Sequence, residues 1–266
     1  MFKSLIKSFV KPHYRAYKIL SYFLHYSTRK YVPKTINAWE PILENLSNAN
    51  SIVHFVQVGS NDGESGDPLN FFIKKYNWHG VLIEPIPFLF QKLKSNYAQQ
   101  KERLKFLNLA VSAHDDELKT FYAIDEKHSN KIPDWYYQLG TFNKNVLSNH
   151  GVPNLEEYMV EKRVPVKMLQ EIIKENMICS NIDLLHIDAE GYDFEILKTL
   201  DFAKTLPKII LIEFYHLEVE KRQQLFKMFR KHRYCIYKRN LDYIAVHAAV
   251  HNAFMEGTRV APFWQY

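Results

Sequence analysis

The sequence is poor in cysteine and glycine, and it contains no uninterrupted apolar run long enough to span a bilayer. Its 266 residues include 2 Cys and 8 Gly. Cys179 and Cys235 provide neither a disulfide framework nor the paired spacing of a zinc site, which favours a reducing compartment. A transmembrane helix needs about 20 mostly apolar residues in succession. We therefore expect a cytoplasmic globular protein.

Acidic residues are missing from the amino-terminal segment. Residues 1–34 contain eight Lys or Arg and no Asp or Glu, so the net charge of +6 comes from this segment and the remainder is nearly neutral. We therefore expect no nucleic-acid partner. Apolar residues within 1–26 recur at helical spacing, so this arm is either an interfacial helix in peripheral contact with a membrane or a helical lid on the main domain. It also lacks the small-residue cleavage site of a signal peptide.

Apolar residues are plentiful, at 47% of the chain, which is ample for one large core. We assign residues 1–45 to the basic arm and 46–266 to a folded domain. In that domain, strand-like runs alternate with helix-like runs, as in an α/β fold with a mostly parallel sheet. Two final strand-like runs suggest a hairpin and an antiparallel edge strand. Residues at about 125–163 break the alternation and are rich in aromatic groups, so this cap-like insertion either shapes a substrate pocket or only packs on the domain.

A glycine-bearing turn follows the first expected strand, at 52–58. The turn is Gly59-Ser-Asn-Asp-Gly63, and a helix is expected at about 68–76. This arrangement presents backbone N–H groups and a positive helix end at one edge of a parallel sheet. Asn61 stands where a dinucleotide fingerprint has its second glycine, so the turn favours a ligand with amine, carboxylate and hydroxyl groups. An ordinary strand-to-helix turn is the alternative.

A single carboxylate closes the next expected strand, at 80–84. Glu84 lies 25 residues after Gly59. An acid at about this distance binds the ribose hydroxyls in nucleotide-binding folds of this class. The alternative is a surface glutamate that begins a loop. We favour a ribose-binding role.

Further carboxylates follow the expected buried strand at 182–187. Asp188 and Glu190 come directly after it, Glu213 ends the next strand, and His216 follows three residues later. Strand carboxyl ends form the ligand crevice of open α/β sheets, so these groups should face the same side as the glycine turn. Two carboxylates there can orient a cationic ligand, bind a metal or accept a proton. A divalent metal held by Asp188 and Glu190 is a minor alternative; the clustered oxygen ligands are too few to indicate one, and we expect none.

Four segments resemble, in order, the FkbM family of S-adenosylmethionine-dependent methyltransferases. They are QVGSNDG at 57–63, VLIEP at 81–85, LHIDAEGYD at 185–193 and IEF at 212–214. The resemblance covers about residues 52–247, and the third segment is its most specific part. It implies the seven-stranded, Rossmann-like class I methyltransferase sheet, S-adenosyl-L-methionine as cofactor, and methylation of hydroxyl groups on sugars or natural products.

The resemblance also implies a cofactor site. That site would comprise Gln57, Gly59, Ser60, Asn61, Asp62, Gly63, Glu84, Pro85, Asn108, Ala110 and Asp188. The glycine turn would line the methionine part, Glu84 would bind the ribose, and Asn108 and Ala110 would border the adenine. Many members have Asp at the position of Gln57, and the glutamine supplies no charge for the cofactor's ammonium group.

For catalysis, the resemblance places Asp188 and Glu190 beside the methyl group and the acceptor. A hydroxyl is a weak nucleophile until a base takes its proton, and we expect Glu190 to act as that base, with His216 as the second choice. The expected acceptor is a small molecule or a glycan. Two alternatives are an NAD-dependent oxidoreductase, which would use a similar turn and acid, and a catalytically silent membrane-associated binding module.

Overall fold

The computed structural model describes residues 33–114, 118–125, 127, 132–148, 155–176 and 182–259. Residues 1–26, for which we considered membrane contact, lie outside this set. Among the helices that are described, none has the length and apolarity to cross a membrane.

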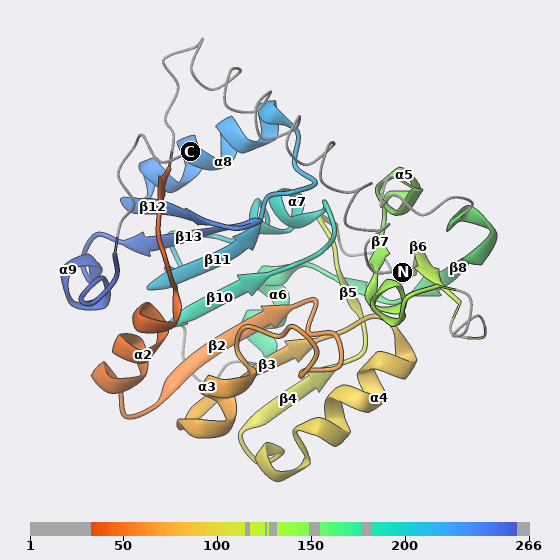
Figure 1. The fold of residues 1–266 in the computed structure, drawn as a ribbon, viewed down its shortest axis with the longest axis horizontal. Helices are drawn as coiled ribbons and strands as arrows, with labels where there is room; N and C mark the ends of the chain where they lie inside the picture. The colour runs from red at the N-terminus through yellow and green to blue at the C-terminus, as the bar shows by residue number, and fades with distance from the viewer. Residues whose placement is uncertain are drawn as a thin grey trace, which may run out of the picture.

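Within the described residues, eight strands form the central sheet, in the order β1-β12-β13-β11-β10-β2-β3-β4 (Figure 1). Their bounds are β1 Lys34–Thr35, β2 Val53–Val58, β3 Trp78–Ile83, β4 Leu104–Leu107, β10 Leu184–Ile187, β11 Ile209–Glu213, β12 Tyr234–Arg239 and β13 Asp242–His247. Every neighbouring pair is parallel except the two pairs that include β13. The expected α/β fold with a mostly parallel sheet is confirmed.

The sheet differs from the expectation in two details. It has an eighth described strand, because the short β1 pairs with β12. The antiparallel strand is β13, which lies between β11 and β12 rather than at the sheet edge. The tight connection after β12 makes β13 its antiparallel neighbour, and β13 is interior because its other edge pairs with β11.

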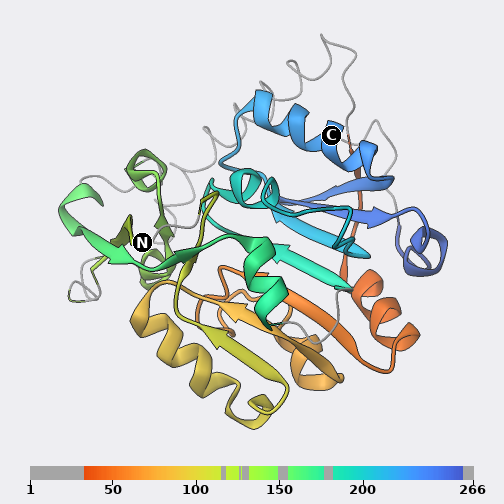
Figure 2. The same ribbon diagram turned by 180° about the vertical axis from the view of Figure 1, so that it is seen from behind.

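Helices cover both faces of the sheet (Figures 1 and 2). One face packs against α2 Glu40–Ala49, α3 Asn70–Lys75, α4 Pro87–Asn96 and α9 His251–Phe254, and the other against α6 Leu169–Asn176, α7 Asp193–Leu197 and α8 Val219–Lys231. Alternate side chains of β2 serve the two cores, so Phe55 packs on the first face and Val56 on the second. The result is a sheet whose carboxyl edge is left for a site.

The folded domain begins earlier than the expected boundary at residue 45, which falls inside α2. Ile42, Leu43 and Leu46 on this helix are fully buried against the sheet. The helix has a proline in its first turn, where the missing N–H costs no hydrogen bond. Together with the pairing of β1 and β12, this burial assigns residues 34–45 to the domain.

Two strands within the insertion were not identified from the sequence, whereas the strand before it, at 119–124, matches an alternating run at 118–123. Antiparallel pairing joins β6 Lys119–Ile124 to β7 Gly140–Thr141 and β8 Met159–Val164. The other described elements of the insertion are η3 Asp134–Gln138, α5 Lys144–Ser148 and η4 Leu155–Tyr158. The short strands β5 Ala110–Val111 and β9 Val166–Lys167 join the insertion to the domain. Outside the insertion, the 3-10 helix η1 Ala98–Gln100 follows α4. β8 was missed because only its last residue is buried, so its side chains carry no apolar alternation. Figure 1 shows this unit on the side toward which β2, β3 and β10 point.

A buried histidine on β10 gives the fold a testable pH dependence. His186 is 4% exposed, and its Nδ1 has no hydrogen-bond partner among the described residues. Burial lowers the pKa of His186 to about 3, whereas a histidine in the unfolded chain has a pKa of about 6.5. As the pH falls below the unfolded value, the unfolded chain takes up a proton that the folded protein excludes, so stability is lost.

We expect His186→Leu to remove this part of the acid sensitivity. Between pH 6.5 and 4.5, wild-type protein should lose about 2–3 kcal/mol more unfolding free energy than the variant, at about 1.4 kcal/mol per pH unit. Urea unfolding at both pH values measures the difference, and carboxylates shared by the two proteins cancel from it. Parallel pH profiles for the two proteins would contradict the prediction.

Candidate active site

The glycine turn lies directly against the end of β10. Gly59 has φ +74°, and a Cβ at this position would lie 1.8 Å from the carbonyl oxygen of Asp188. Only glycine allows this approach. Asn61 is left-handed at φ 53°, a conformation that asparagine tolerates better than most residues. The turn and the segment after β10, which are far apart in the sequence, therefore meet at one edge of the sheet.

The carboxylate of Glu84 fixes the turn from the end of β3. Its Oε2 accepts a hydrogen bond from the backbone N–H of Asn61 at 2.9 Å, and its Oε1 accepts one from Ile86 N–H at 2.7 Å. Glu84 is 4% exposed, and burial raises its pKa to about 7. Asn108 Nδ2 donates to the carbonyl oxygens of Glu84 and Pro85 at 2.8 and 3.2 Å. Each carboxylate oxygen retains a second lone pair that can accept a ligand hydroxyl.

Gln57 has a charged neighbour that the sequence analysis overlooked. Its Nε2 donates to Asp67 Oδ1 at 2.9 Å, and the Tyr97 hydroxyl donates to Asp67 Oδ2 at 3.0 Å. Gln57 is 1% exposed, and its Oε1 has no hydrogen-bond partner among the described residues. Burial raises the pKa of Asp67. The only signal in the sequence was an aspartate before Pro68 in the turn-to-helix segment.

A sharp turn after β10 carries the second set of carboxylates. Glu190 is left-handed at φ 48° and Gly191 has φ +88°. Asp193 holds the turn, because its carboxylate accepts backbone hydrogen bonds from Ala189 at 2.9 Å and Gly191 at 3.0 Å. Burial, opposed by these hydrogen bonds, raises the pKa of Asp193 to about 7. Asp193 therefore has a structural role, and the turn it braces presents Asp188 and Glu190.

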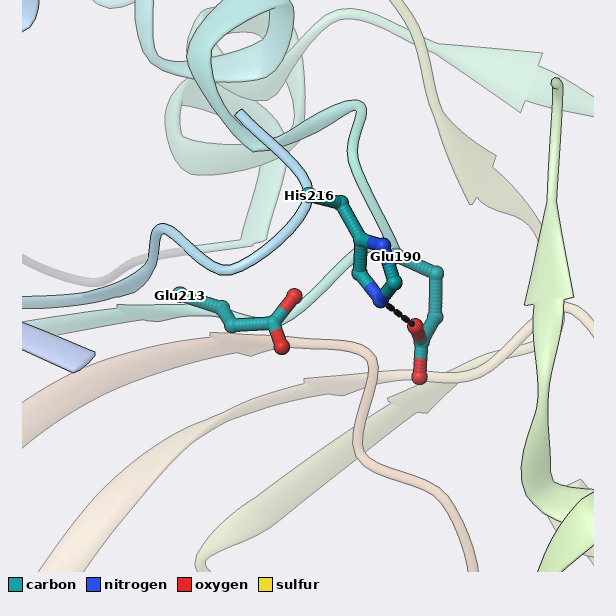
Figure 3. Close-up of side chains that lie close together, drawn as sticks. All are labelled: Glu190, Glu213 and His216. Carbon is teal, nitrogen blue, oxygen red and sulfur yellow. Dashed lines mark ion pairs between the residues drawn. The ribbon is translucent and has the colours of Figure 1, made fainter. Parts of the chain in front are cut away.

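Figure 3 shows the carboxylate of Glu190 beside the imidazole of His216, with Glu213 next to them. The distance from His216 Nε2 to Glu190 Oε2 is 3.2 Å. These side chains come from the turn after β10, the end of β11 and the loop before α8. The structure thus brings together the two residues considered as bases. It adds Glu213, which the sequence analysis placed nearby and gave no role.

Like charges shape the electrostatics of this edge. Burial, followed by the charges of Asp188 and Glu190, raises the pKa of Glu213 well above its usual range. The Asp188 side chain is partly in contact with solvent. The pKa of Asp188 is nevertheless raised, first because the surrounding protein removes water from its carboxylate and second because Glu190 carries a like charge. Asp242 pairs with Glu213 across β11 and β13, and burial raises its pKa to about 6. Such displaced pKa values are typical of functional sites.

The insertion contacts this site. Thr141 Oγ1 on β7 donates to the carbonyl oxygen of Glu190 at 2.9 Å. The rings of Phe142 and Tyr192 lie 4.9 Å apart, and a Cβ at Gly191 would lie 3.3 Å from Val146. The unit therefore packs on the turn that carries Glu190.

Comparisons with known proteins point to one family. The family model described as "Methyltransferase FkbM domain" matches residues 57–244. No protein of curated function matches the sequence significantly.

Among solved structures, methyltransferase FkbM from Methylobacillus flagellatus KT aligns at 14% identity with a TM-score of 0.45, covering 74% of this chain and 44% of its own. The N-terminal domain of human METTL16 aligns at 11% identity with a TM-score of 0.41, covering 77% and 65%. TrmK of M. capricolum, in complex with S-adenosyl-homocysteine, aligns at 12% identity with a TM-score of 0.38, covering 77% and 65%. The chain thus spans less than two thirds of the length of each.

The match to the family model includes the glycine turn, Glu84 and the cluster of Glu190, Glu213 and His216. It also extends over most of the chain. On this basis the chain belongs to the FkbM family of methyltransferases.

Proposed function

We propose that the protein transfers a methyl group from S-adenosylmethionine to a hydroxyl group of a sugar, a glycan or a related small molecule. The observation that carries the proposal is the proximity of Glu190, on the turn that follows Asp188, to His216, in the loop after β11, at 3.2 Å. The backbone of Asp188 in turn touches the glycine turn at Gly59. A proton acceptor therefore lies near the expected cofactor turn, which is the arrangement that hydroxyl methylation needs.

The residues around the glycine turn fit the polar groups of this cofactor. Gln57 Oε1 is a buried acceptor without a partner among the described residues, which suits an ammonium donor. Asp67, hydrogen-bonded to the same amide, supplies the negative charge that Gln57 lacks. Glu84 would accept the ribose hydroxyls through its remaining lone pairs, with a small shift of the Asn61 turn that covers it. Asn108 and Ala110 would border the adenine.

The chain's own task in the reaction is alignment and proton acceptance. When bound, the cofactor supplies an already activated methyl group on its sulfonium, so the protein must hold the acceptor oxygen in line with it. In Figure 3, one carboxylate oxygen of Glu190 faces His216 and the other points away. We assign proton acceptance to that second oxygen. His216 then orients Glu190 and stabilises its charge, and Asp188 helps to position the acceptor.

The alternatives have less support. An NAD-dependent oxidoreductase is disfavoured by the family and by Asn61 at the position of the second fingerprint glycine. A catalytically silent binding module does not account for a histidine and a glutamate paired at the sheet edge. The near-neutral charge of the chain after residue 34 gives no reason to propose nucleic acid as the acceptor.

The first prediction concerns cofactor binding. Glu84→Ala should weaken S-adenosylhomocysteine binding by about 1.5–3 kcal/mol, because it removes charged acceptors for the ribose hydroxyls. Titration calorimetry measures the change. Glu84→Gln, which keeps the size and one acceptor oxygen, should fall between wild type and Glu84→Ala.

Glu64→Ala is the matched control, because Glu64 lies in the same turn region but is solvent-exposed beside Lys74. It should bind the cofactor as wild type does. Wild-type affinity in a folded Glu84→Ala protein would remove Glu84 from the cofactor site.

The second prediction separates chemistry from binding. Glu190→Gln keeps size and hydrogen bonding but is no longer a base, so methyl transfer should fall about 10²–10⁴-fold. The affinity for S-adenosylhomocysteine should barely change, since a base that acts during transfer contributes little to ground-state binding. Single-turnover assays with labelled cofactor and a panel of hydroxylated acceptors provide the measurement.

His216→Ala tests the competing assignment, and Glu195→Gln is a control for a nearby glutamate that pairs with Lys198 and Lys221. We expect partial activity in His216→Ala and full activity in Glu195→Gln. A fully active Glu190→Gln together with an inactive His216→Ala would transfer the role of base to the histidine.

A further inference from the structure

Three potential metal ligands converge at the carboxyl edge of the sheet. Glu190, Glu213 and His216 each offer one ligand atom, and these atoms all lie within 4.8 Å of one another (Figure 3). The set contains two carboxylate oxygens and one imidazole nitrogen. The sequence analysis expected no metal because it counted only the carboxylates after β10, and the strand pairing of β10 with β11 is what brings Glu213 to them.

One carboxylate oxygen of Glu213 lacks a hydrogen-bond donor among the described residues. Its Oε2 is buried and accepts no hydrogen bond from any described residue. No lysine or arginine of the described segments forms an ion pair with it either. A buried carboxylate oxygen without a donor is costly and calls for a cation or a proton.

The residues around Glu213 add negative charge and do not offset the charge of its carboxylate. Four further carboxylates act on Glu213 with like charge, namely Asp188, Glu190, Asp193 and Asp242. Asp193 has backbone N–H donors for its own carboxylate, whereas no described residue donates to Glu213 Oε2. A divalent cation at this position would neutralise the cluster and satisfy Glu213 Oε2.

We propose that Glu190, Glu213 and His216 bind a divalent transition-metal ion. Metal–ligand distances of about 2.0–2.2 Å place two ligand atoms at most about 4.4 Å apart. The Glu190–His216 pair, at 3.2 Å, already meets this limit, and the remaining separations, at up to 4.8 Å, need only a small side-chain adjustment. One imidazole with two carboxylates suits Mn²⁺ or Zn²⁺ better than Mg²⁺ or Ca²⁺.

The metal would take the oxygen of Glu190 that faces His216 and leave the other oxygen for proton acceptance. It would also make an acceptor hydroxyl that reaches it more acidic, which lowers the demand on the base. The inference does not depend on the proposed methyl transfer, because metal binding is measured without cofactor or acceptor.

The test uses Mn²⁺ as the probe on full-length protein that has been treated with chelator. Loss of the free Mn²⁺ electron paramagnetic resonance signal should show one saturable site per chain. Glu213→Gln should weaken binding at least about 10-fold, because a neutral amide is a poor ligand for this ion. Zn²⁺ should displace the bound Mn²⁺.

Asp242→Asn is the matched control, because Asp242 is the cross-strand neighbour of Glu213 and is not among the potential metal ligands. A coordination site loses Mn²⁺ only in Glu213→Gln, whereas a diffuse negative patch loses it equally in both variants. Equal loss, or absence of saturable binding in wild type, would overturn the proposal. If circular dichroism shows that Glu213→Gln is unfolded, His216→Gln takes its place with the same expected result.

Discussion

The site depends on the absence of a side chain at residue 59. The backbone of the glycine turn passes so close to the carbonyl of Asp188 that any Cβ would overlap it. This contact fixes the distance between the turn after β2 and the turn after β10. β2 lies at the switch point of the sheet, with β3 and β4 on one side and β10 and β11 on the other. Ligand sites of open α/β sheets form at such a point.

The carboxylates at this edge divide into two groups with different tasks. Glu84 and Asp193 accept hydrogen bonds from backbone N–H groups, and each thereby fixes the turn beside it. Glu190 instead lies 3.2 Å from the imidazole of His216, and Glu213 leaves an oxygen without a hydrogen-bond partner among the described residues. The first group supplies a rigid frame, and the second supplies groups that can react or bind.

Much of the fold could be predicted from local patterns. The mostly apolar runs of β2, β3 and β10 give strands within about two residues of the expected bounds, since buried parallel strands are largely apolar. β8 could not be predicted, because its side chains are mostly outside the core. The beginning of the domain was placed too late. The apolar face of α2 directly follows the basic arm in the sequence, and its residues were therefore assigned to the arm rather than to the core.

The site was only partly predictable because its contacts are non-local. Glu190 and His216 could be proposed from their positions at strand ends, and the structure brings them together. The contact of Asp67 with Gln57 depends on how the turn folds back on β2. The convergence of Glu213 with Glu190 depends on the register of β10 against β11, in which Ile187 pairs with Ile212. A shift of that register by one residue would turn Glu213 to the other face, so the chemistry of this edge rests on strand pairing as much as on residue type.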